Sequence, residues 1–340
     1  MAEDPNIHTL IYGQAYPTVM DVATEAGKAF AHLYERYPDK NFFVSSLVTG
    51  KIQAGMRFGM MPEEPVQALN GIPFLQGSEN TLRAVKSLND YAEFLRRRAT
   101  SGDISREESA VAEQARAIVQ AAGGKPLVER TAKQLLNLYG IPTTLEQLAT
   151  TADEAVVAAN AIGFPVVLKI ESPDITHKTD AGGVLLNLRD DAAVRSGFDQ
   201  IMSSARAYNP DAELSGVLVG QMAPRGREMI VGMTRDPDFG PAVAVGLGGI
   251  FVEVLKDVAL GVPPLSEMAA RDMLDRLRGK AILEGTRGQG PADVDAIVDV
   301  LLKFSQLCVD LRDDVVEIDI NPLLVYEDGA LVVDCLVVAG

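Results

Sequence analysis

One stretch near the middle of the chain constrains its fold most: a short apolar run that ends in a lysine and leads into a polar loop. Residues 164–168 are apolar and largely branched, which suits a short buried strand, and Lys169 follows them directly. The loop 171–183 then carries a histidine, a lysine and the adjacent glycines Gly182 and Gly183. Backbone amides beside glycine can approach an anion because no Cβ lies in the way. The stretch therefore predicts a phosphate site, although an ordinary solvated loop would also contain such residues.

The overall charge and the cysteine content argue against several classes of protein. With 340 residues and a formal net charge of −16, the chain would be repelled by nucleic acid and by anionic membrane surfaces. We expect no secretory signal, since no basic segment precedes an apolar core at the N-terminus, and no apolar run reaches the roughly 20 residues that span a bilayer. The two cysteines, Cys308 and Cys335, are not clustered. They fit a reducing cytoplasm and provide neither a disulfide framework nor a zinc site.

The first hundred residues alternate strand and helix patterns, which predicts part of a parallel sheet. The expected strands are 9–12, 41–48 and 71–75, and the expected helices are 20–37 and 79–98. Three strands are few for an independent doubly wound domain, so an exposed sheet edge that needs a partner is expected here. Residues 99–124 are polar and small, and they predict a linker with one helix at 106–119.

The remaining residues predict helices together with antiparallel strands. Helices are expected at 127–138, 153–162, 192–208, 269–277 and 291–311. Strands are expected at 143–145, at 164–169, at 184–188, 216–222, 228–233, 242–246 and 250–255, and at 315–320, 323–325 and 331–338. The pair of glycines at 182 and 183 should then lie near a hairpin.

Three motifs resemble, in order and spacing, the ATP-grasp part of the ADP-forming acyl-CoA synthetases, which are relatives of succinyl-CoA synthetase. They read SPDITHKTDAGGV at 172–184, GLGGIFVEVLKD at 246–257 and EIDINPL at 317–323. The resemblance implies an α/β protein with an ATP-grasp fold of two α+β lobes at 125–340. Residues 99–124 would be the linker, and 1–98 would be a partial parallel-sheet, flavodoxin-like segment of the CoA-ligase domain.

The same resemblance implies a set of nucleotide-binding residues for ATP and ADP. Lys169 matches the lysine that contacts the phosphates, whereas without this context it could equally be a strand-end lysine reaching solvent. The other implied nucleotide contacts are Gly182, Gly183, Gln221, Met222, Glu228, Gly248 and Gly249. Gln221 and Met222 would offer backbone groups to adenine, and the glycines would let the backbone approach a phosphate or would simply make tight turns.

Three oxygen-bearing side chains near the C-terminus are the expected Mg²⁺ ligands. Asn321 and Asp334 lie on strands that flank a predicted hairpin, so their oxygens can converge on one hard cation. Asp319 is one alternation away from Asn321 and faces the same side of its strand. The resemblance supports the magnesium assignment, and solvated carboxylates at strand ends are the alternative.

His177 matches the second phosphorylated histidine of the family, and a neutral imidazole is a competent phosphoryl acceptor. The implied reaction converts a carboxylic acid, CoA and ATP into acyl-CoA, ADP and phosphate, with His177 as the catalytic relay. The family's CoA-binding unit and its primary phosphohistidine loop have no counterpart in the sequence. We therefore expect a CoA-binding chain or domain as partner, and an oligomeric cytoplasmic ligase that is incomplete without it. The alternatives are an ATP-grasp ligase with other chemistry, or a non-catalytic partner subunit.

Overall fold

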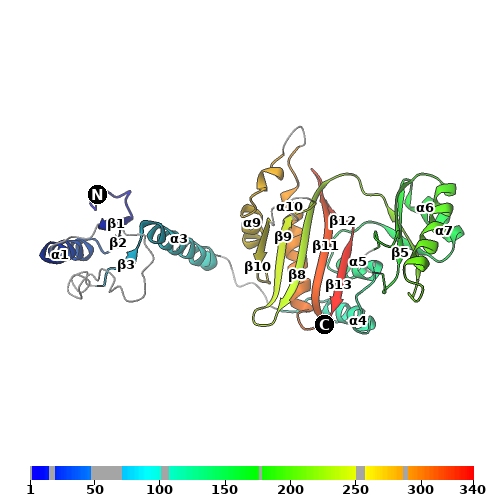
Figure 1. Ribbon diagram of the computed structural model, residues 1–340, viewed down its shortest axis with the longest axis horizontal. Coiled ribbons are helices and arrows are strands. Elements are labelled where there is room, and N and C mark those ends of the chain that lie inside the picture. Colours follow the sequence, from blue (N-terminus) through cyan, green and yellow to red (C-terminus); the bar gives the residue numbers. More distant parts are fainter. Residues whose placement is uncertain are drawn as a thin grey trace. The chain divides into compact units, whose positions relative to one another are not determined.

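The computed structural model describes residues 2–14, 20–46, 71–100, 107–175, 178–249, 257–285 and 290–340. The chain forms two compact units, Met1–Gly102 and Asp103–Gly340 (Figure 1). The limits predicted from the sequence, 1–98, 99–124 and 125–340, remain predictions about domain organisation. Among the described helices, none combines the length and the apolar character that a membrane crossing requires.

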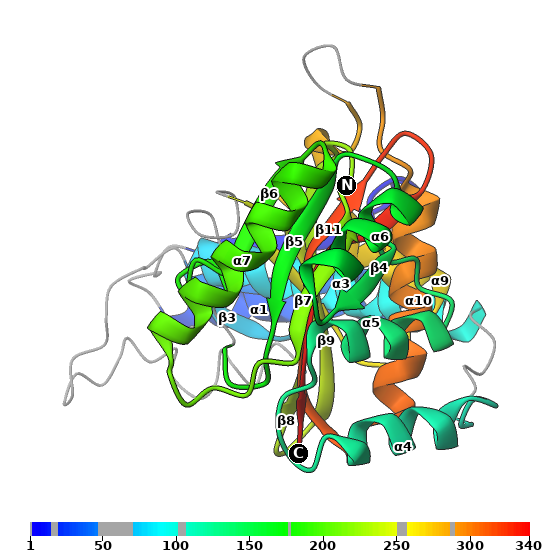
Figure 2. The same cartoon turned by 90° about the vertical axis from the view of Figure 1, so that its right-hand side faces the viewer.

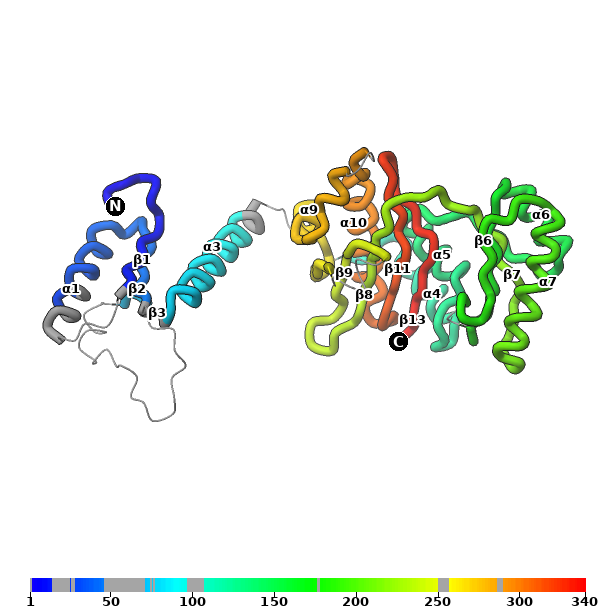
Figure 3. The backbone as a smooth tube through the Cα atoms, turned by 45° about the horizontal axis from the view of Figure 1, so that its top comes forward, coloured from blue at the N-terminus to red at the C-terminus, as the bar shows by residue number. Residues whose placement is uncertain are grey.

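The first unit contains a parallel sheet with strand order β1-β2-β3, as the alternating pattern predicted. Its elements are β1 (Thr9–Gln14), α1 (Met20–Arg36), β2 (Asn41–Ser46), β3 (Phe74–Gln76) and α3 (Ser78–Thr100). Figure 3 shows α1 and α3 beside these strands. The buried apolar cluster of the described residues is small and consists of Ala31, Phe42, Val44 and Ile72.

The second unit has two lobes, and the smaller lobe contains the strand that ends near Lys169. The unit begins with α4 (Ala112–Ala121) and α5 (Glu129–Leu138), and the smaller lobe then contains β4 (Glu146–Ala149), α6 (Ala152–Ile162), β5 (Val166–Glu171), β6 (Val184–Leu188), α7 (Asp191–Tyr208) and β7 (Gly216–Gln221). The four strands are antiparallel in the order β4-β7-β5-β6. Helices α6 and α7 cover one face of this sheet (Figure 2). Alternate residues of β5 therefore face these helices, and Lys169 faces the other way.

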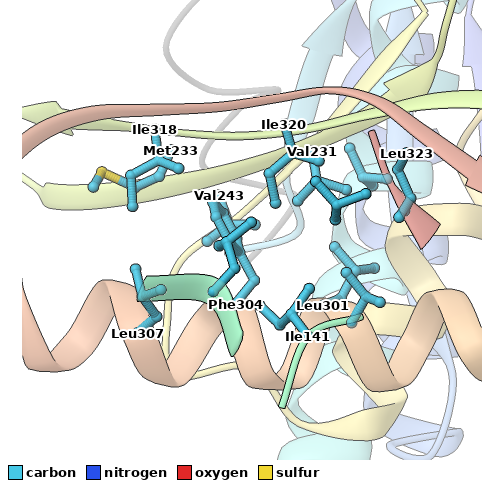
Figure 4. Packing of buried hydrophobic residues seen from close by; sticks show 14 of the residues in the cluster. Ile141, Val231, Met233, Val243, Leu301, Phe304, Leu307, Ile318, Ile320 and Leu323 are labelled. Carbon is cyan, nitrogen blue, oxygen red and sulfur yellow. The ribbon is translucent and has the colours of Figure 1, made fainter. Parts of the chain in front are cut away.

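The larger lobe is a six-stranded sheet with the path β10-β9-β8-β11-β12, and β13 pairs with β11. Its elements are β8 (Arg227–Asp236), β9 (Gly240–Leu247), β10 (Val258–Gly261), α9 (Glu267–Asp275), the short 3-10 helix η1 (Lys280–Ile282), α10 (Val294–Asp310), β11 (Val315–Val325), β12 (Ala330–Val332) and β13 (Cys335–Ala339). Figure 4 shows Phe304 and Leu301 of α10 against Val243, Ile318 and Ile320 of the sheet. All five side chains are at most 1% exposed, so this packing is the main core of the lobe.

A buried carboxylate at the end of α10 joins three segments of the second unit. Asp310 is 2% exposed and accepts hydrogen bonds from the backbone amide and the hydroxyl of Ser109, at 3.2 and 2.5 Å. Tyr139 Oη donates to it at 2.9 Å and Gln306 Nε2 at 2.8 Å. Burial, and then the bond to Asp310, raise the pKa of the Tyr139 phenol. The segment before α4 and the end of α5 are thus tied to α10.

The predicted and observed elements differ mainly at their ends. The strand expected at 143–145 begins at Glu146 instead, because β4 pairs with β7 in the register Glu146 with Gly220. The strands expected at 315–320 and 323–325 form one strand, β11, whose register shift between Ile320 and Leu323 accommodates the proline. Strand β10 was not predicted, the helix expected at 106–119 begins at Ala112, and the strand expected at 250–255 lies outside the described residues.

Candidate functional site: a buried cluster of lysines and carboxylates

The candidate site is built around Glu129, in the first turn of α5 and only 3% exposed. Its Oε1 accepts from Lys169 Nζ at 2.5 Å and from Lys133 Nζ at 2.9 Å, while its Oε2 accepts from Lys178 Nζ at 2.8 Å. Burial alone would raise the pKa of Glu129, but the three ammonium groups outweigh it and hold this pKa below its ordinary value of 4.5. Glu129 is therefore an ionised carboxylate that collects three lysines from three segments.

Lys169 connects the smaller lobe to the larger one. Its Nζ lies 3.3 Å from Asp334 Oδ2 and donates to the carbonyl oxygen of Val333 at 3.3 Å. Burial favours the neutral amine, but Asp334 and Glu129 reverse this effect and raise the pKa of Lys169. The side chain therefore stays protonated at neutral pH, at the point where the two sheets meet. The assignment of Lys169 to the phosphates remains a prediction.

The loop between β5 and β6 approaches the same carboxylates. Lys178 contacts Glu129 and also lies 3.9 Å from Asp334 Oδ1. The amide of Gly183 donates to the carbonyl oxygen of Lys178 at 2.8 Å, and a Cβ on Gly183 would lie 2.4 Å from Ile170 Cγ2. The hairpin predicted around Gly182 and Gly183 is confirmed, and glycine at 183 is required because the loop closes directly onto β5. His177 itself lies outside the described residues.

A small pocket opens between Lys169 and the end of β7. It is lined by Lys133, Thr144, Glu146, Val167, Lys169, Leu218, Gly220, Gln221 and Val333. The predicted residues Lys169 and Gln221 thus line the same pocket. The backbone amide of Gln221 donates a hydrogen bond to the carbonyl oxygen of Leu145 at 2.8 Å, which fixes the backbone at this residue. Met222 is the next residue along the chain and is half-buried.

Glu228, Gly248 and Gly249 also come together, although they are far apart in sequence. The amide of Gly248 donates to the carbonyl oxygen of Glu228 at 2.7 Å, and a Cβ on Gly248 would lie 2.8 Å from Glu228 Cβ. An ideal Cβ on Gly249 would lie 3.2 Å from Glu228 Oε2. Glycine at 248 therefore allows this loop to lie against the start of β8. A larger side chain at this position would prevent the contact.

Two of the three predicted metal ligands, Asp319 and Asn321, lie on β11 of the larger lobe. Asp334 lies between β12 and β13, so the strand expected at 331–338 is interrupted at this residue. Asp319 pairs with Leu336 across β11 and β13, and the amide of Asn321 donates to the carbonyl oxygen of Asp334 at 3.2 Å. Burial, and then the negative charges of Glu317 and Asp334, raise the pKa of Asp319, while a hydrogen bond with the Asn321 side chain opposes this. Within the ranges that the structure describes, no group of three or more histidine, cysteine, aspartate or glutamate side chains is arranged to hold a metal ion. The predicted set contains only two such carboxylates, with an amide as its third member.

Sequence reasoning missed the centre of this site. Glu129, Lys133 and Glu146 were not predicted to be functional, although all three line the pocket or hold its lysines. Glutamate and lysine four residues apart on a helix usually form a solvent-exposed pair, so their spacing gave no sign of burial. The available signal was the helical spacing of Glu129, Lys133 and Leu136, which places the charged pair on the same side of the helix as an apolar residue.

Comparisons with known proteins agree with this geometry. A family model described as an ATP-grasp domain matches residues 118–338. The beta subunit of ADP-forming acetate–CoA ligase I from Pyrococcus furiosus is 48% identical over 223 residues, which cover 65% of this chain and 96% of that subunit. ADP-forming acetate–CoA ligase I from Archaeoglobus fulgidus is 39% identical over 280 residues, or 82% of this chain but only 40% of that protein.

A solved structure also matches the second unit. The dinucleotide-forming acetyl-coenzyme A synthetase 1 of Ca. Korarchaeum cryptofilum, in complex with coenzyme A and Ca-AMPCP, matches with 41% identity and a TM-score of 0.65. The match covers 66% of this chain and all of that one. Another structure of the same protein contains Mg-AMPPCP, with its phosphohistidine segment pointing towards the nucleotide-binding site, and matches with a TM-score of 0.59.

Proposed function

The chain belongs to the ATP-grasp family of ADP-forming acyl-CoA ligases, and from this premise we propose which of its residues carry the nucleotide half of the ligation. As a ligase of this family it works with ATP and ADP, and the predicted ATP-grasp fold and acid–thiol ligase activity are confirmed. The observation that carries the proposal is the protonated Lys169, held between Glu129 of one segment and Asp334 of another where the lobes meet.

The nucleotide lies in the pocket between the lobes. Lys169 supplies the charge for the phosphates, and the glycines at 182–183 and 248–249 let the backbone come close to them, with Glu228 beside the second pair. Gln221 and Met222, at the end of β7, offer backbone groups to the base. This proposal is supported by the pocket that Lys169 and Gln221 share and by the contact of Gly248 with Glu228.

Mg²⁺ suits the donors that Asp319, Asn321 and Asp334 provide, because it prefers carboxylate and amide oxygens. A bound Mg²⁺ would neutralise phosphate charge and orient the phosphates. The side chain of Asp334 lies 3.3 Å from Lys169, so the metal ligands and the phosphate lysine form one continuous site. Asp334 holds Lys169 and Lys178 at the edge of the pocket, and this keeps both ammonium groups within reach of an incoming phosphate.

His177 is the proposed phosphoryl acceptor. It precedes Lys178, whose ammonium group is fixed by Glu129 at 2.8 Å, so its neighbour in sequence is anchored within the charged site. A neutral imidazole nitrogen attacks the terminal phosphorus of ATP, the bond to the ADP oxygen breaks, and the phosphoryl group remains on His177. The cationic surroundings of Lys169 and Lys178 stabilise the charge on the transferred group.

The proposed partner is a CoA-binding chain or domain. Relatives support this in two ways: the matched region forms nearly all of a separate beta subunit in Pyrococcus furiosus, but only 40% of the longer chain in Archaeoglobus fulgidus. A partner that supplies CoA and the carboxylic acid would complete the reaction, and selectivity for the acid would then belong to it. The two free cysteines, both buried, agree with a cytoplasmic location.

The test is to incubate the chain with Mg²⁺ and γ-labelled ATP and to measure acid-labile, base-stable phosphate. We expect label on His177 that ADP removes, and no label on the His177→Ala variant. His32→Ala is the matched control, because His32 is exposed on α1 and should not affect labelling. Label that persists in His177→Ala would contradict the proposal, and so would ATP binding without label even when the candidate partner chain is added.

A further inference from the structure

Glu146 carries a buried carboxylate oxygen that has no hydrogen-bond partner. Its Oε2 accepts from Lys133 Nζ at 2.6 Å, whereas Oε1 is covered from solvent and unpaired within the described part of the chain. The whole side chain is only 8% exposed. A buried acceptor without a partner costs free energy comparable to a lost hydrogen bond. A ligand that donates a hydrogen bond to this oxygen would therefore gain binding free energy.

The unpaired oxygen belongs to the wall of the nucleotide pocket. Glu146 pairs with Gly220 across β4 and β7, and Gly220 pairs with Val167 across β7 and β5. Directly paired residues of an antiparallel sheet share one face, so these three form a row that faces the pocket they line. Gly220 in the centre has no side chain, and a Cβ there would come within 3.1 Å of Val167 Cγ1. The row is therefore a flat floor with a carboxylate at one end.

Lys169 lies on the other side of the pocket, on β5, two strands away from β4. Its ammonium group is joined to the Glu146 carboxylate through Glu129 and Lys133, by contacts of 2.5, 2.9 and 2.6 Å. A nucleotide that places its phosphates at Lys169 and its planar base over Gly220 would bring one edge of the base to Glu146. The pocket thus presents an ammonium group for phosphates at Lys169 and an unpaired carboxylate oxygen for a hydrogen-bond donor at Glu146.

We propose that Glu146 Oε1 accepts a hydrogen bond from the 6-amino group of adenine and selects adenine over guanine nucleotides. This inference rests on the proposed nucleotide site. Adenine presents an amino donor at its 6-position, whereas guanine presents a carbonyl oxygen there, which a carboxylate repels. Specificity then comes from an attractive contact with one base and a repulsive contact with the other.

Lys133 fixes the orientation of this group. It donates to Glu146 Oε2, to Thr144 Oγ1 at 3.0 Å and to Glu129 Oε1 at 2.9 Å, so its three protons are used. Oε1 is left without a donor from the described part of the chain. Burial is the main cause that raises the pKa of Glu146, with Lys133 opposing it, and a donor from the ligand would favour the ionised form further.

The competing explanation is that Glu146 serves only to neutralise Lys133. Nucleotides that differ in the group at the 6-position of the base distinguish this explanation from recognition of the base. Binding of ATP, GTP and purine riboside 5′-triphosphate, which is ATP without its 6-amino group, is measured by calorimetry with Mg²⁺ present. Wild-type protein should bind ATP at least about tenfold more tightly than either of the others, because each leaves the buried oxygen unpaired. Equal affinity for ATP and the analogue without the amino group would overturn the proposal without any variant.

The Glu146→Gln variant sharpens the test. The ammonium of Lys133 can only donate, so it orients the amide oxygen of the glutamine towards itself and leaves the amide NH₂ facing the pocket. The preference for ATP over GTP should then fall by about tenfold or more, and the loss caused by removing the 6-amino group should disappear. Glu213→Gln, an exposed glutamate of the same lobe, is the control and should keep the wild-type ratios.

Two further outcomes would contradict the proposed role of Glu146 in different ways. Unchanged ratios in Glu146→Gln, with ATP still bound, would overturn the role of Glu146 and leave the proposed function in place. Failure of the wild-type chain to bind any of the three nucleotides with Mg²⁺ would overturn the proposed function, and the inference with it. Thermal melting of each variant shows whether the fold is retained.

Discussion

Two buried carboxylates of the second unit are satisfied by different kinds of donor. Within the described ranges, the Asp310 carboxylate accepts from neutral groups: a backbone amide, two hydroxyls and a side-chain amide. The Glu129 carboxylate there accepts from the ammonium groups of three lysines. Neutral donors fix a carboxylate without adding charge, whereas ammonium groups bring charges that can also serve an incoming anion. Similar burial therefore accompanies a joint between segments in one case and the proposed phosphate site in the other.

Removing one ammonium group should give the largest effect. In Lys169→Met the stem remains but the charge is lost, and Glu129 keeps Lys133 and Lys178 as partners. Phosphoryl transfer from ATP should fall by roughly 100-fold or more, the usual result of removing one preorganised donor from a reaction site. The measurement is the initial rate of labelling by γ-labelled ATP.

Lys280→Ala is the control for this substitution. Lys280 pairs with Asp275 and Glu284 on the surface, at 3.0 and 3.6 Å, and is far from the pocket residues in sequence. Labelling should be unchanged in this variant. A similar loss of labelling in Lys280→Ala would show that general charge, rather than the position of Lys169, controls transfer.

Removing the central carboxylate should have the next largest effect, this time on stability. Glu129→Gln leaves the buried ammonium groups of Lys133 and Lys169 with less compensation, and breaking such a buried pair costs about 3 kcal/mol. The pKa of Glu129 is held below 4.5 in the folded chain, so its contribution to stability is complete above about pH 4.5. It is lost as the pH falls through the folded pKa.

The urea midpoints of wild type and Glu129→Gln should therefore differ most at pH 7 and converge as the solution becomes acidic. The far-UV circular dichroism transition of the second unit gives both midpoints. A constant difference from pH 7 down to pH 3 would mean that the ionised carboxylate is not what stabilises the fold.

Changing the neutral network should give the smallest of the three effects and should spare the chemistry. In Asp310→Asn one acceptor becomes a donor and faces groups that can only donate or prefer to donate, at a cost of about 2 kcal/mol. Hydrogen exchange of α10 amides measures this loss as a lower free energy of opening. ATP affinity should stay within about twofold of wild type. Binding that is about tenfold weaker, a loss of about 1.4 kcal/mol, would mean that the neutral network also supports the nucleotide site, and the distinction between the two networks would be lost.

Periodicity predicted most of the fold because each lobe has a regular apolar pattern. Strand β5 and helix α7 were predicted within two residues at each end, since an apolar strand or an amphipathic helix marks its own limits. Strand β4 was misplaced because its position depends on pairing with β7, and pairing is a contact between distant segments. Strand β11 was divided in two because proline usually interrupts a ladder, whereas here a register shift absorbs it.

The site was only partly predictable, for a related reason. Lys169 could be found because a single lysine in an apolar strand is unusual in any sequence. Glu129 and Glu146 could not, because their importance comes from burial beside other charges, and burial of charge follows from tertiary packing. The predicted pocket residues, Lys169 and Gln221, were assigned by their place relative to the family's motifs, which contain neither them nor the two glutamates.

The alternation along β11 links folding to chemistry. Ile318 and Ile320 face α10, and Asp319 between them faces the other side. A slip of one residue in the pairing of β11 would turn both isoleucines to water and drive the aspartate into the apolar core. Misregistered molecules would thus lose the proposed metal ligand and the core together, so partially active misfolded forms should not accumulate. Activity in a preparation of this chain would then count correctly folded molecules directly.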